Sequence, residues 1–166
     1  LAVPVVYNCG GYESLETLRL LEGLVDVYMP DVKYARSAAG AQYSAVQDYP
    51  AVARAALAEM YRQVGPLEVR DGLATRGVLV RHLVLPAEAA GPAETAACPC
   101  GAGSDGCAVV DLVAAAAPGC AIHVMGQYHP AHRAWDHPEL ARRPTGEHVR
   151  CLRAYAAERG LQRVDH

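Results

Sequence analysis

The sequence has 166 residues and a formal net charge of -3, which is enough chain for a single domain with a buried core. A charge this small, without a basic stripe or an acidic tail, argues against a nucleic-acid partner. No apolar run approaches the roughly 20 residues that cross a bilayer, and no signal peptide is recognisable. We therefore expect no membrane partner and predict a cytoplasmic protein.

The six cysteines are even in number, but without a secretory signal they predict reduced thiols rather than a disulfide framework. Residue 1 is a leucine that leads at once into a strand-like run. We therefore expect that residue 1 is not the natural start, and that the sequence is a fragment or has been cut from a longer chain.

The first third of the chain reads as strand, helix and strand. Residues 3–7 are short, apolar and β-branched, as in a buried strand, and a turn with two glycines, Gly10 and Gly11, follows. Ser14 can cap a helix that runs to about Glu22, with its leucines on one face. Residues 25–29 form the second predicted strand.

Two charged residues, Asp31 and Lys33, follow that second strand directly. Lys33 is the only lysine among the 15 lysine and arginine residues of the chain. A compact ammonium and a planar guanidinium do different chemical work, so Lys33 is a candidate site residue. A solvated loop lysine remains the alternative.

Residues 35–47 show no clear period, whereas Asp48-Tyr49-Pro50 begins a strong helix that ends at Gly65. Residues 78–85 are the clearest strand, and Arg81 and His82 interrupt its apolar run. A buried charge is costly unless it is paired, so one of these two side chains is expected to point into a site. An edge strand whose charges reach water is the alternative.

The last half of the chain begins with residues 87–107, rich in Ala, Gly, Pro and Cys, which we interpret as a loop or poorly ordered insert. A helix is predicted over residues 109–117 and a strand over 120–125, and the polar pair Tyr128-His129 follows that strand. A long loop then leads to a last helix at about residues 147–159, capped by Thr145.

This alternation predicts an α/β fold, with a parallel sheet and helices outside it. Ligands of parallel α/β folds sit at the carboxyl ends of the strands. The unusual polar residues fall at these ends, and Arg81 can reach the same region from within its strand. The sequence therefore predicts one site that includes Asn8, Asp31, Lys33, Arg81 and His129.

Four stretches in this order, YNCGGY, VDVYMPDVKY, VLVRHLVLP and VMGQYHP, resemble the radical SAM enzymes. The closest branch is the one similar to pyruvate formate-lyase-activating enzymes. The resemblance covers nearly the whole chain but only the later part of that family's domain. It implies a partial parallel (β/α) barrel, about the last four strand units of a (β/α)₆ barrel, over residues 1–130. Residues 131–166 would then be a loop and a helix that pack on the barrel.

The resemblance also implies cofactors, partners and residue roles. Lys33, beside Asp31, would contact the amino-acid part of S-adenosylmethionine, with Arg81 and His129 around it. The turn from Asn8 to Gly11, with Asn8 and Gly10 as its binding residues, would also belong to the cofactor site. The family often has an aspartate before this turn, and here Val6 and Tyr7 stand there. Tyr128, with Tyr7 and Tyr28, could flank the adenine. The parent enzyme would cleave S-adenosylmethionine reductively to a 5′-deoxyadenosyl radical. An electron donor and a glycyl-radical-type protein substrate would be its partners.

The cluster loop of the family is missing from this sequence. The family holds a 4Fe–4S cluster on C-x3-C-x2-C, and no such spacing is present. Cys98, Cys100 and Cys107 match neither that loop nor a standard zinc pattern. We therefore expect no metal site and no radical chemistry from this chain alone. Two alternatives remain, a non-catalytic module that binds S-adenosylmethionine or a partner, and an unrelated α/β domain that binds a small anion.

Overall fold

The computed structural model describes residues 3–86 and 105–164. Within these ranges strands and helices alternate along the chain. The elements are β1 (Val6–Cys9), α1 (Leu15–Leu20), β2 (Val27–Pro30), α2 (Ser37–Ser44), α3 (Tyr49–Val64), β3 (Glu68–Arg70), β4 (Leu73–Leu83), α4 (Asp105–Ala116), β5 (Ala121–Met125), η2 (His132–Asp136), α5 (Gly146–Glu158) and β6 (Gln162–Arg163).

The described strands form one mostly parallel sheet in the order β1-β2-β4-β5-β6. Each neighbouring pair in this order is parallel, and β3 pairs antiparallel with β4. The predicted α/β class with a parallel sheet is thus confirmed. Along this order the parallel strands follow one another in sequence, as expected when helical crossovers connect neighbouring parallel strands.

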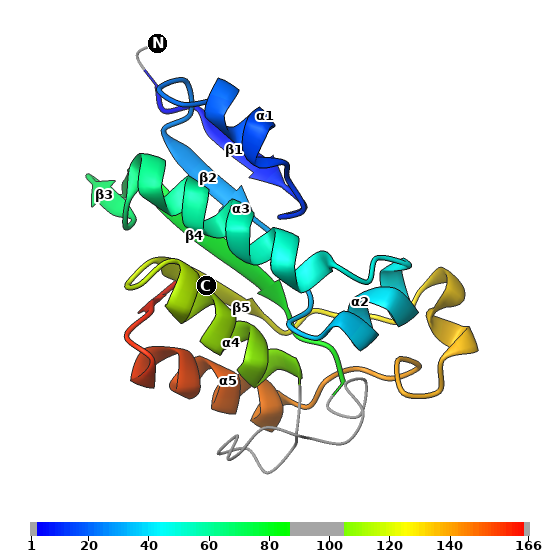
Figure 1. Cartoon of the computed structure of the whole chain (residues 1–166). Helices are drawn as coiled ribbons and strands as arrows, with labels where there is room; N and C mark the ends of the chain where they lie inside the picture. Colours follow the sequence, from blue (N-terminus) through cyan, green and yellow to red (C-terminus); the bar gives the residue numbers. More distant parts are fainter. Residues whose placement is uncertain (1–2, 87–104, 165–166) are drawn as a thin grey trace.

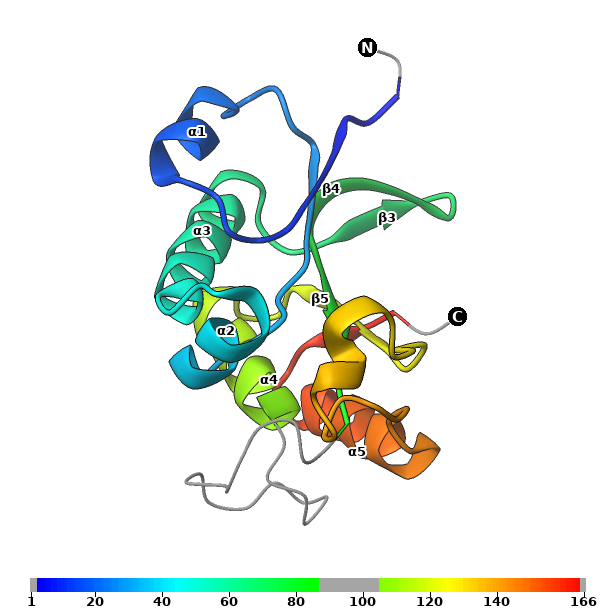
Figure 2. The ribbon, with the colours of Figure 1, turned by 90° about the vertical axis from the view of Figure 1, so that its right-hand side faces the viewer.

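The helices α1, α3 and α4 lie on one face of this sheet. Figure 1 shows α1, α3 and α4 in front of the strands, and the turned view in Figure 2 places α1 and α3 to one side of them. The main core lies between these layers and includes residues such as Leu18, Met60, Val80 and Val110, all fully buried. Burying this apolar surface is the main stabilising term of such a layered fold.

Strand β4 shows which face is covered. Val78, Val80 and His82 are buried on the helix side, whereas the alternate residues Leu79 and Arg81 are only half-buried. Because successive side chains of a strand point to opposite faces, Arg81 lies on the face away from the helices. The alternative of an edge strand whose two charges reach water is wrong, because β4 lies between β2 and β5 and His82 is buried. That one of the two side chains points into a site stays a prediction.

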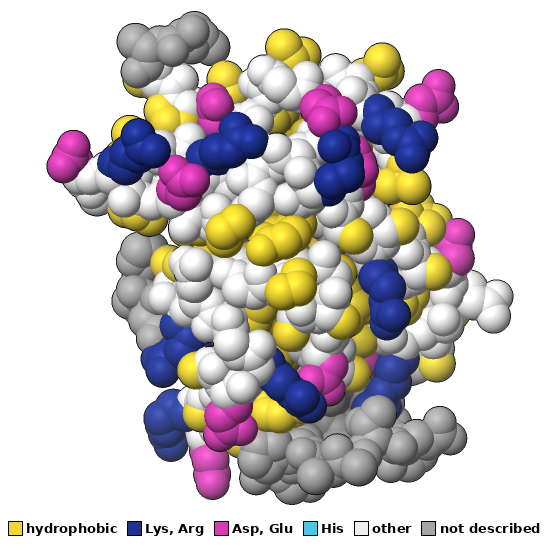
Figure 3. All heavy atoms as spheres, turned by 60° about the vertical axis from the view of Figure 1, so that its left-hand side comes forward, with side chains coloured by type: hydrophobic (Ala, Val, Ile, Leu, Met, Phe, Trp, Pro, Cys, Tyr) yellow, Lys and Arg dark blue, Asp and Glu magenta, His cyan; other side chains and the backbone are white. Residues whose placement is uncertain are grey.

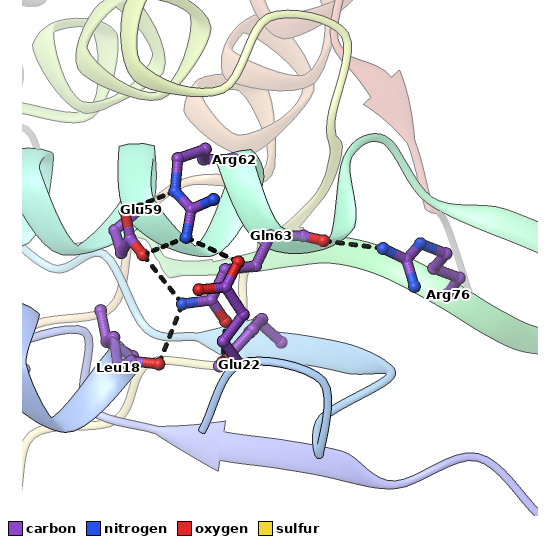
Figure 4. Close-up of polar contacts among 7 residues, drawn as sticks. Leu18, Glu22, Glu59, Arg62, Gln63 and Arg76 are labelled. Carbon is purple, nitrogen blue, oxygen red and sulfur yellow. Dashed lines mark hydrogen bonds and ion pairs between the residues drawn. The ribbon is translucent and has the colours of Figure 1, made fainter. Parts of the chain in front are cut away.

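A polar network joins α1, α3 and β4 (Figure 4). The Gln63 amide donates to the Leu18 carbonyl oxygen and to Glu59, both at 2.9 Å. The side-chain oxygen Oε1 of Gln63 accepts a hydrogen bond of 2.6 Å from the hydroxyl of Tyr28, a fully buried residue. The Arg76 guanidinium donates to the backbone carbonyl oxygen of Gln63 at 2.7 Å. Gln63 therefore satisfies polar groups from several elements at once.

Replacing Gln63 with leucine is expected to lower the free energy of unfolding by about 2 kcal/mol, because the Tyr28 hydroxyl loses its partner away from water. Urea unfolding measures this change. The control is Gln47→Leu, at an exposed glutamine before α3, which should change stability by less than about 0.5 kcal/mol. Equal unfolding midpoints for the two variants would contradict the role given to Gln63.

Several element predictions need correction. Residues 35–47 contain the helix α2, and residues 67–76, where no element is predicted, contain β3 and the start of β4. The first strand begins at Val6 rather than Val3. Ser14 and Thr145 cap α1 and α5 as predicted, accepting hydrogen bonds from the backbone N–H of Thr17 and His148. The 3-10 helix η2 and the short β6 were not predicted.

The expectation of reduced thiols is wrong for two cysteines. Cys107 in α4 and Cys151 in α5 are disulfide-bonded, whereas Cys9 and Cys120 are free. Disulfides require close approach in space, which spacing along a sequence does not show. Most of the predicted insert at 87–107, with Cys98 and Cys100, lies outside the described residues.

Charged side chains are mixed on the face shown in Figure 3, where basic and acidic groups alternate and neither sign forms a patch. Among the residues that the structure describes, no helix has the length and apolar character needed to cross a membrane.

Candidate functional site

An open cleft of about 570 Å³ lies at the carboxyl ends of β2, β4 and β5. This volume is in the range of small-molecule sites. Five residues predicted for the site line it. They are Asp31, Lys33, Arg81, Tyr128 and His129. The cleft is on the face that carries Arg81, away from the helix layer.

Arg81 connects three parallel strands at this cleft. Its Nε and Nη2 lie 2.8 and 2.7 Å from Oδ1 of Asp31, which follows β2. Nη2 also donates to Oδ1 of Asn8 in β1 at 2.9 Å. Both side chains of the Arg81–Asp31 pair are 27% exposed, so water and ligands can reach them. Asn8 thus belongs to the site through Arg81, and the guanidinium is largely committed to protein partners.

The backbone around Asp31 is held on both sides. The Val32 N–H donates to the Arg81 carbonyl oxygen at 2.9 Å, which continues the sheet past the end of β2. The buried Tyr49 hydroxyl accepts from the Lys33 N–H and donates to the Asp31 carbonyl oxygen, both at 3.0 Å. Burial raises the Tyr49 pKa to about 12, so this hydroxyl stays protonated as a donor. The segment is therefore fixed before any ligand binds.

Lys33 presents its side chain from this fixed segment. The residue is exposed at the rim of the cleft. Within residues 3–86 and 105–164, the structure gives its ammonium no hydrogen bond or ion pair, in contrast to the paired Arg81. An accessible cation on an ordered backbone can meet an anionic group of a ligand.

The glycine turn after β1 packs directly under the Asp31 backbone. Gly11 has a φ of +77°, and a Cβ at this position would collide with the Asp31 carbonyl oxygen. Gly10, the glycine predicted to bind the cofactor, has open space around it and is exposed. The close approach thus requires Gly11 rather than Gly10. Burial raises the pKa of the neighbouring Cys9 to about 11, which leaves this thiol protonated near neutral pH.

The segment after β5 forms another wall of the cleft. The Tyr128 hydroxyl donates to the Leu140 carbonyl oxygen at 2.9 Å, which orients the ring from behind. Nδ1 of the exposed His129 lies 2.8 Å from the Pro130 carbonyl oxygen. A carbonyl can only accept, so Nδ1 carries a proton and Nε2 of the neutral ring is left as an acceptor. Two other tyrosines, Tyr7 and Tyr28, were candidates to flank the adenine. Tyr28 cannot do so because it is fully buried and hydrogen-bonded to Gln63, and Tyr7 does not line the cleft.

Several lining residues were not predicted. Tyr34, Ser44 and Gln127 line the cleft, and Tyr34 and Ser44 are also shared with a second open cleft of about 510 Å³. Ala45 and His132, on this second cleft, have left-handed φ values of 55° and 48°. Non-glycine residues seldom adopt this conformation, and such strain is often found at functional sites. Tyr34 and Gln127 adjoin predicted site residues, whereas Ser44 has no signal in the sequence.

Metal binding finds no support in the described part of the chain. Residues 3–86 and 105–164 contain no group of three or more His, Cys, Asp and Glu side chains that could hold a metal ion. Of their four cysteines, two are free and well separated in the sequence, and two are disulfide-bonded. This donor set does not fit a 4Fe–4S cluster, which is usually held by several thiolates.

No protein-family model matches the sequence. Among known proteins, the chain is similar to an uncharacterized protein of Methanocaldococcus jannaschii, with 28% identity over 149 residues. The matched region covers 89% of this chain and 36% of that relative, so the chain spans about a third of the relative's length.

Proposed function

We propose that the cleft binds S-adenosylmethionine, and that the chain is part of a radical SAM enzyme of the branch similar to pyruvate formate-lyase-activating enzymes. One observation carries the proposal. Three family motifs that are far apart in the sequence supply Asp31 with Lys33, Arg81, and Tyr128 with His129, and all five residues line one cleft at the carboxyl ends of three parallel strands. The proposed barrel fold is compatible with the sequential order of these strands.

Charged groups of the cleft complement the amino-acid part of S-adenosylmethionine. The Lys33 ammonium is suited to the α-carboxylate through a charge-assisted hydrogen bond. Of the two carboxylate oxygens of Asp31, Arg81 contacts Oδ1. The other oxygen, Oδ2, can therefore accept a hydrogen bond from the α-ammonium of the ligand. Arg81 then serves to orient Asp31 and Asn8 rather than to bind the carboxylate itself.

Polar and aromatic groups on the β5 side suit the nucleoside part. Nε2 of His129 is an acceptor for a ribose hydroxyl or for the adenine amino group. The Tyr128 ring, held through its hydroxyl, offers a flat apolar face to the adenine. A few polar contacts combined with an aromatic wall are typical of small-molecule sites.

The radical step is proposed for a longer protein and not for these residues. In the family a 4Fe–4S cluster supplies the electron that cleaves S-adenosylmethionine to a 5′-deoxyadenosyl radical. The described residues offer no fitting donor set for that cluster. An electron donor, a glycyl-radical-type protein substrate and a cytoplasmic location complete the proposal. The cytoplasmic location rests on the family resemblance alone, because the disulfide-bonded state of Cys107 and Cys151 is more typical of an oxidising compartment.

The same observation favours a second candidate function, binding of S-adenosylmethionine without redox chemistry. The binding groups are present in the described chain, whereas the cluster ligands are not. Both candidates use the same cleft and the same role for Lys33.

Isothermal titration of the purified chain with S-adenosylmethionine tests the shared claim. We expect saturable binding at one site, and binding about tenfold weaker or worse for decarboxylated S-adenosylmethionine, which lacks the group that Lys33 meets. No binding of either compound would overturn the proposal. Equal binding of both would remove the role of Lys33. Binding of inorganic phosphate in place of both nucleosides would indicate a small-anion site instead.

A further inference from the structure

A small pocket lies on the helix side of the sheet, beside the segment that carries Lys33. Its void is about 10 Å³, close to the size of one water molecule. His82 of β4, Asp105 and Gly106 at the start of α4, and His148 of α5 contribute to its lining. Gly106 permits close packing at this point, because a Cβ there would lie 2.7 Å from a Leu152 methyl carbon and 3.4 Å from Nε2 of His82.

His82 is 2% exposed, and its hydrogen bond fixes the form of its ring. Nδ1 lies 2.8 Å from the Val32 carbonyl oxygen. Since a carbonyl only accepts, Nδ1 carries the proton. Burial lowers the His82 pKa to about 4, which keeps the ring neutral near neutral pH. The lone pair of Nε2 then faces the pocket, where the structure gives it no hydrogen-bond partner.

Asp105 brings a second acceptor to the same pocket. Its Oδ2 accepts from the Ala35 N–H at 2.9 Å, whereas the buried Oδ1 has no hydrogen bond and lies 3.6 Å from Nε of Arg36. Two buried acceptors that share a water-sized void call for a small molecule with two donors.

We propose that one buried water molecule occupies this pocket and donates to Nε2 of His82 and Oδ1 of Asp105, and that His82 is the positioning residue for the Asp31–Lys33 segment. His82 holds the Val32 carbonyl and Asp105 holds the Ala35 amide, so the two side chains fix both ends of the loop that carries Lys33. The water joins these two supports. The positioning role rests on the proposed binding of S-adenosylmethionine, whereas the water site does not.

The first experiment examines the wild-type chain by imidazole ¹⁵N NMR and by high-resolution crystallography. At neutral pH we expect His82 to be neutral with its proton on Nδ1, and we expect electron density for one water over Gly106. A proton on Nε2, a charged ring or an empty pocket would overturn the water site. In Gly106→Ala, whose methyl group enters the pocket, the water density should be lost.

The second experiment compares two variants of His82 in binding S-adenosylmethionine. In His82→Asn the side-chain amide can still donate to the Val32 carbonyl, so the Kd should stay within about threefold of wild type. In His82→Leu that donor is lost, and the Kd should rise about tenfold. Equal affinities for the two variants would overturn the positioning role.

The outcomes separate this inference from the proposed function. If the wild-type chain does not bind S-adenosylmethionine, the proposed function fails, and the NMR and crystallographic results still decide the water site. If wild type binds and the two His82 variants bind equally, the proposed function stands and the positioning role fails. If His82→Leu does not fold, a Kd for His82→Asn beyond threefold of wild type overturns the role.

Discussion

Lys33→Ala is expected to weaken binding of S-adenosylmethionine by about 10- to 100-fold, because a hydrogen bond between charged groups contributes about 1.5–3 kcal/mol. The variant should fold normally, since the side chain is exposed and its N–H, not its ammonium, makes the contact with Tyr49. Isothermal titration gives the Kd, and thermal unfolding checks the fold.

The control for Lys33→Ala is Arg70→Ala, which removes one positive charge at an exposed position in β3, away from the cleft. Its Kd should match that of wild type. Lys33→Arg is the informative second variant, because it keeps the charge and changes the geometry of the donor. If Lys33→Ala and Arg70→Ala bind equally well, net charge or some other group, and not the ammonium of Lys33, is responsible for binding.

Gly11→Ala is expected to lower the free energy of unfolding by about 3–5 kcal/mol. Two effects act together, a left-handed backbone that disfavours a side chain and a collision of the new Cβ with the Asp31 carbonyl oxygen. Chemical denaturation measures the loss. Because the Asp31 backbone must shift, ligand affinity should also fall in protein that remains folded.

Two glycines give matched controls for Gly11→Ala. Gly23 has a φ of +78°, nearly that of Gly11, but open space around it, so Gly23→Ala should cost only about 1 kcal/mol. Gly10→Ala, next in the same turn and also with open space, should change stability little. If Gly11→Ala and Gly23→Ala cost the same, the contact with Asp31 is not what requires glycine.

Helix start and stop residues and the spacing of apolar residues predicted much of the secondary structure. The helix α3 was predicted almost to its ends, because Pro50 suits a first turn, Gly65 stops a helix and the apolar positions repeat on one side. In contrast, α2 buries only Ala39 and Gly40, so its sequence has no apolar period to detect. The hairpin strand β3 is exposed along its length and shows no alternation between buried and exposed residues.

The candidate site was predicted as a set of residues but not as a set of contacts. The position after a parallel strand was enough to select Asp31, Lys33 and His129. Arg81 is separated along the sequence by 50 residues from Asp31 and by 73 residues from Asn8. No local sequence pattern predicts contacts between residues so far apart in the chain. The same holds for Tyr49, a helix residue by its sequence context, whose hydroxyl supports the Lys33 backbone.

The single lysine has a practical consequence for studying the cleft. All other basic side chains except histidine are guanidinium groups, so Lys33 is the one side chain of the sequence with a primary amine. Amine-directed reagents would therefore modify this chain only at its amino terminus and at the rim of the cleft. The rate of that modification would report directly, by mass spectrometry and without any engineered label, on whether a ligand covers Lys33.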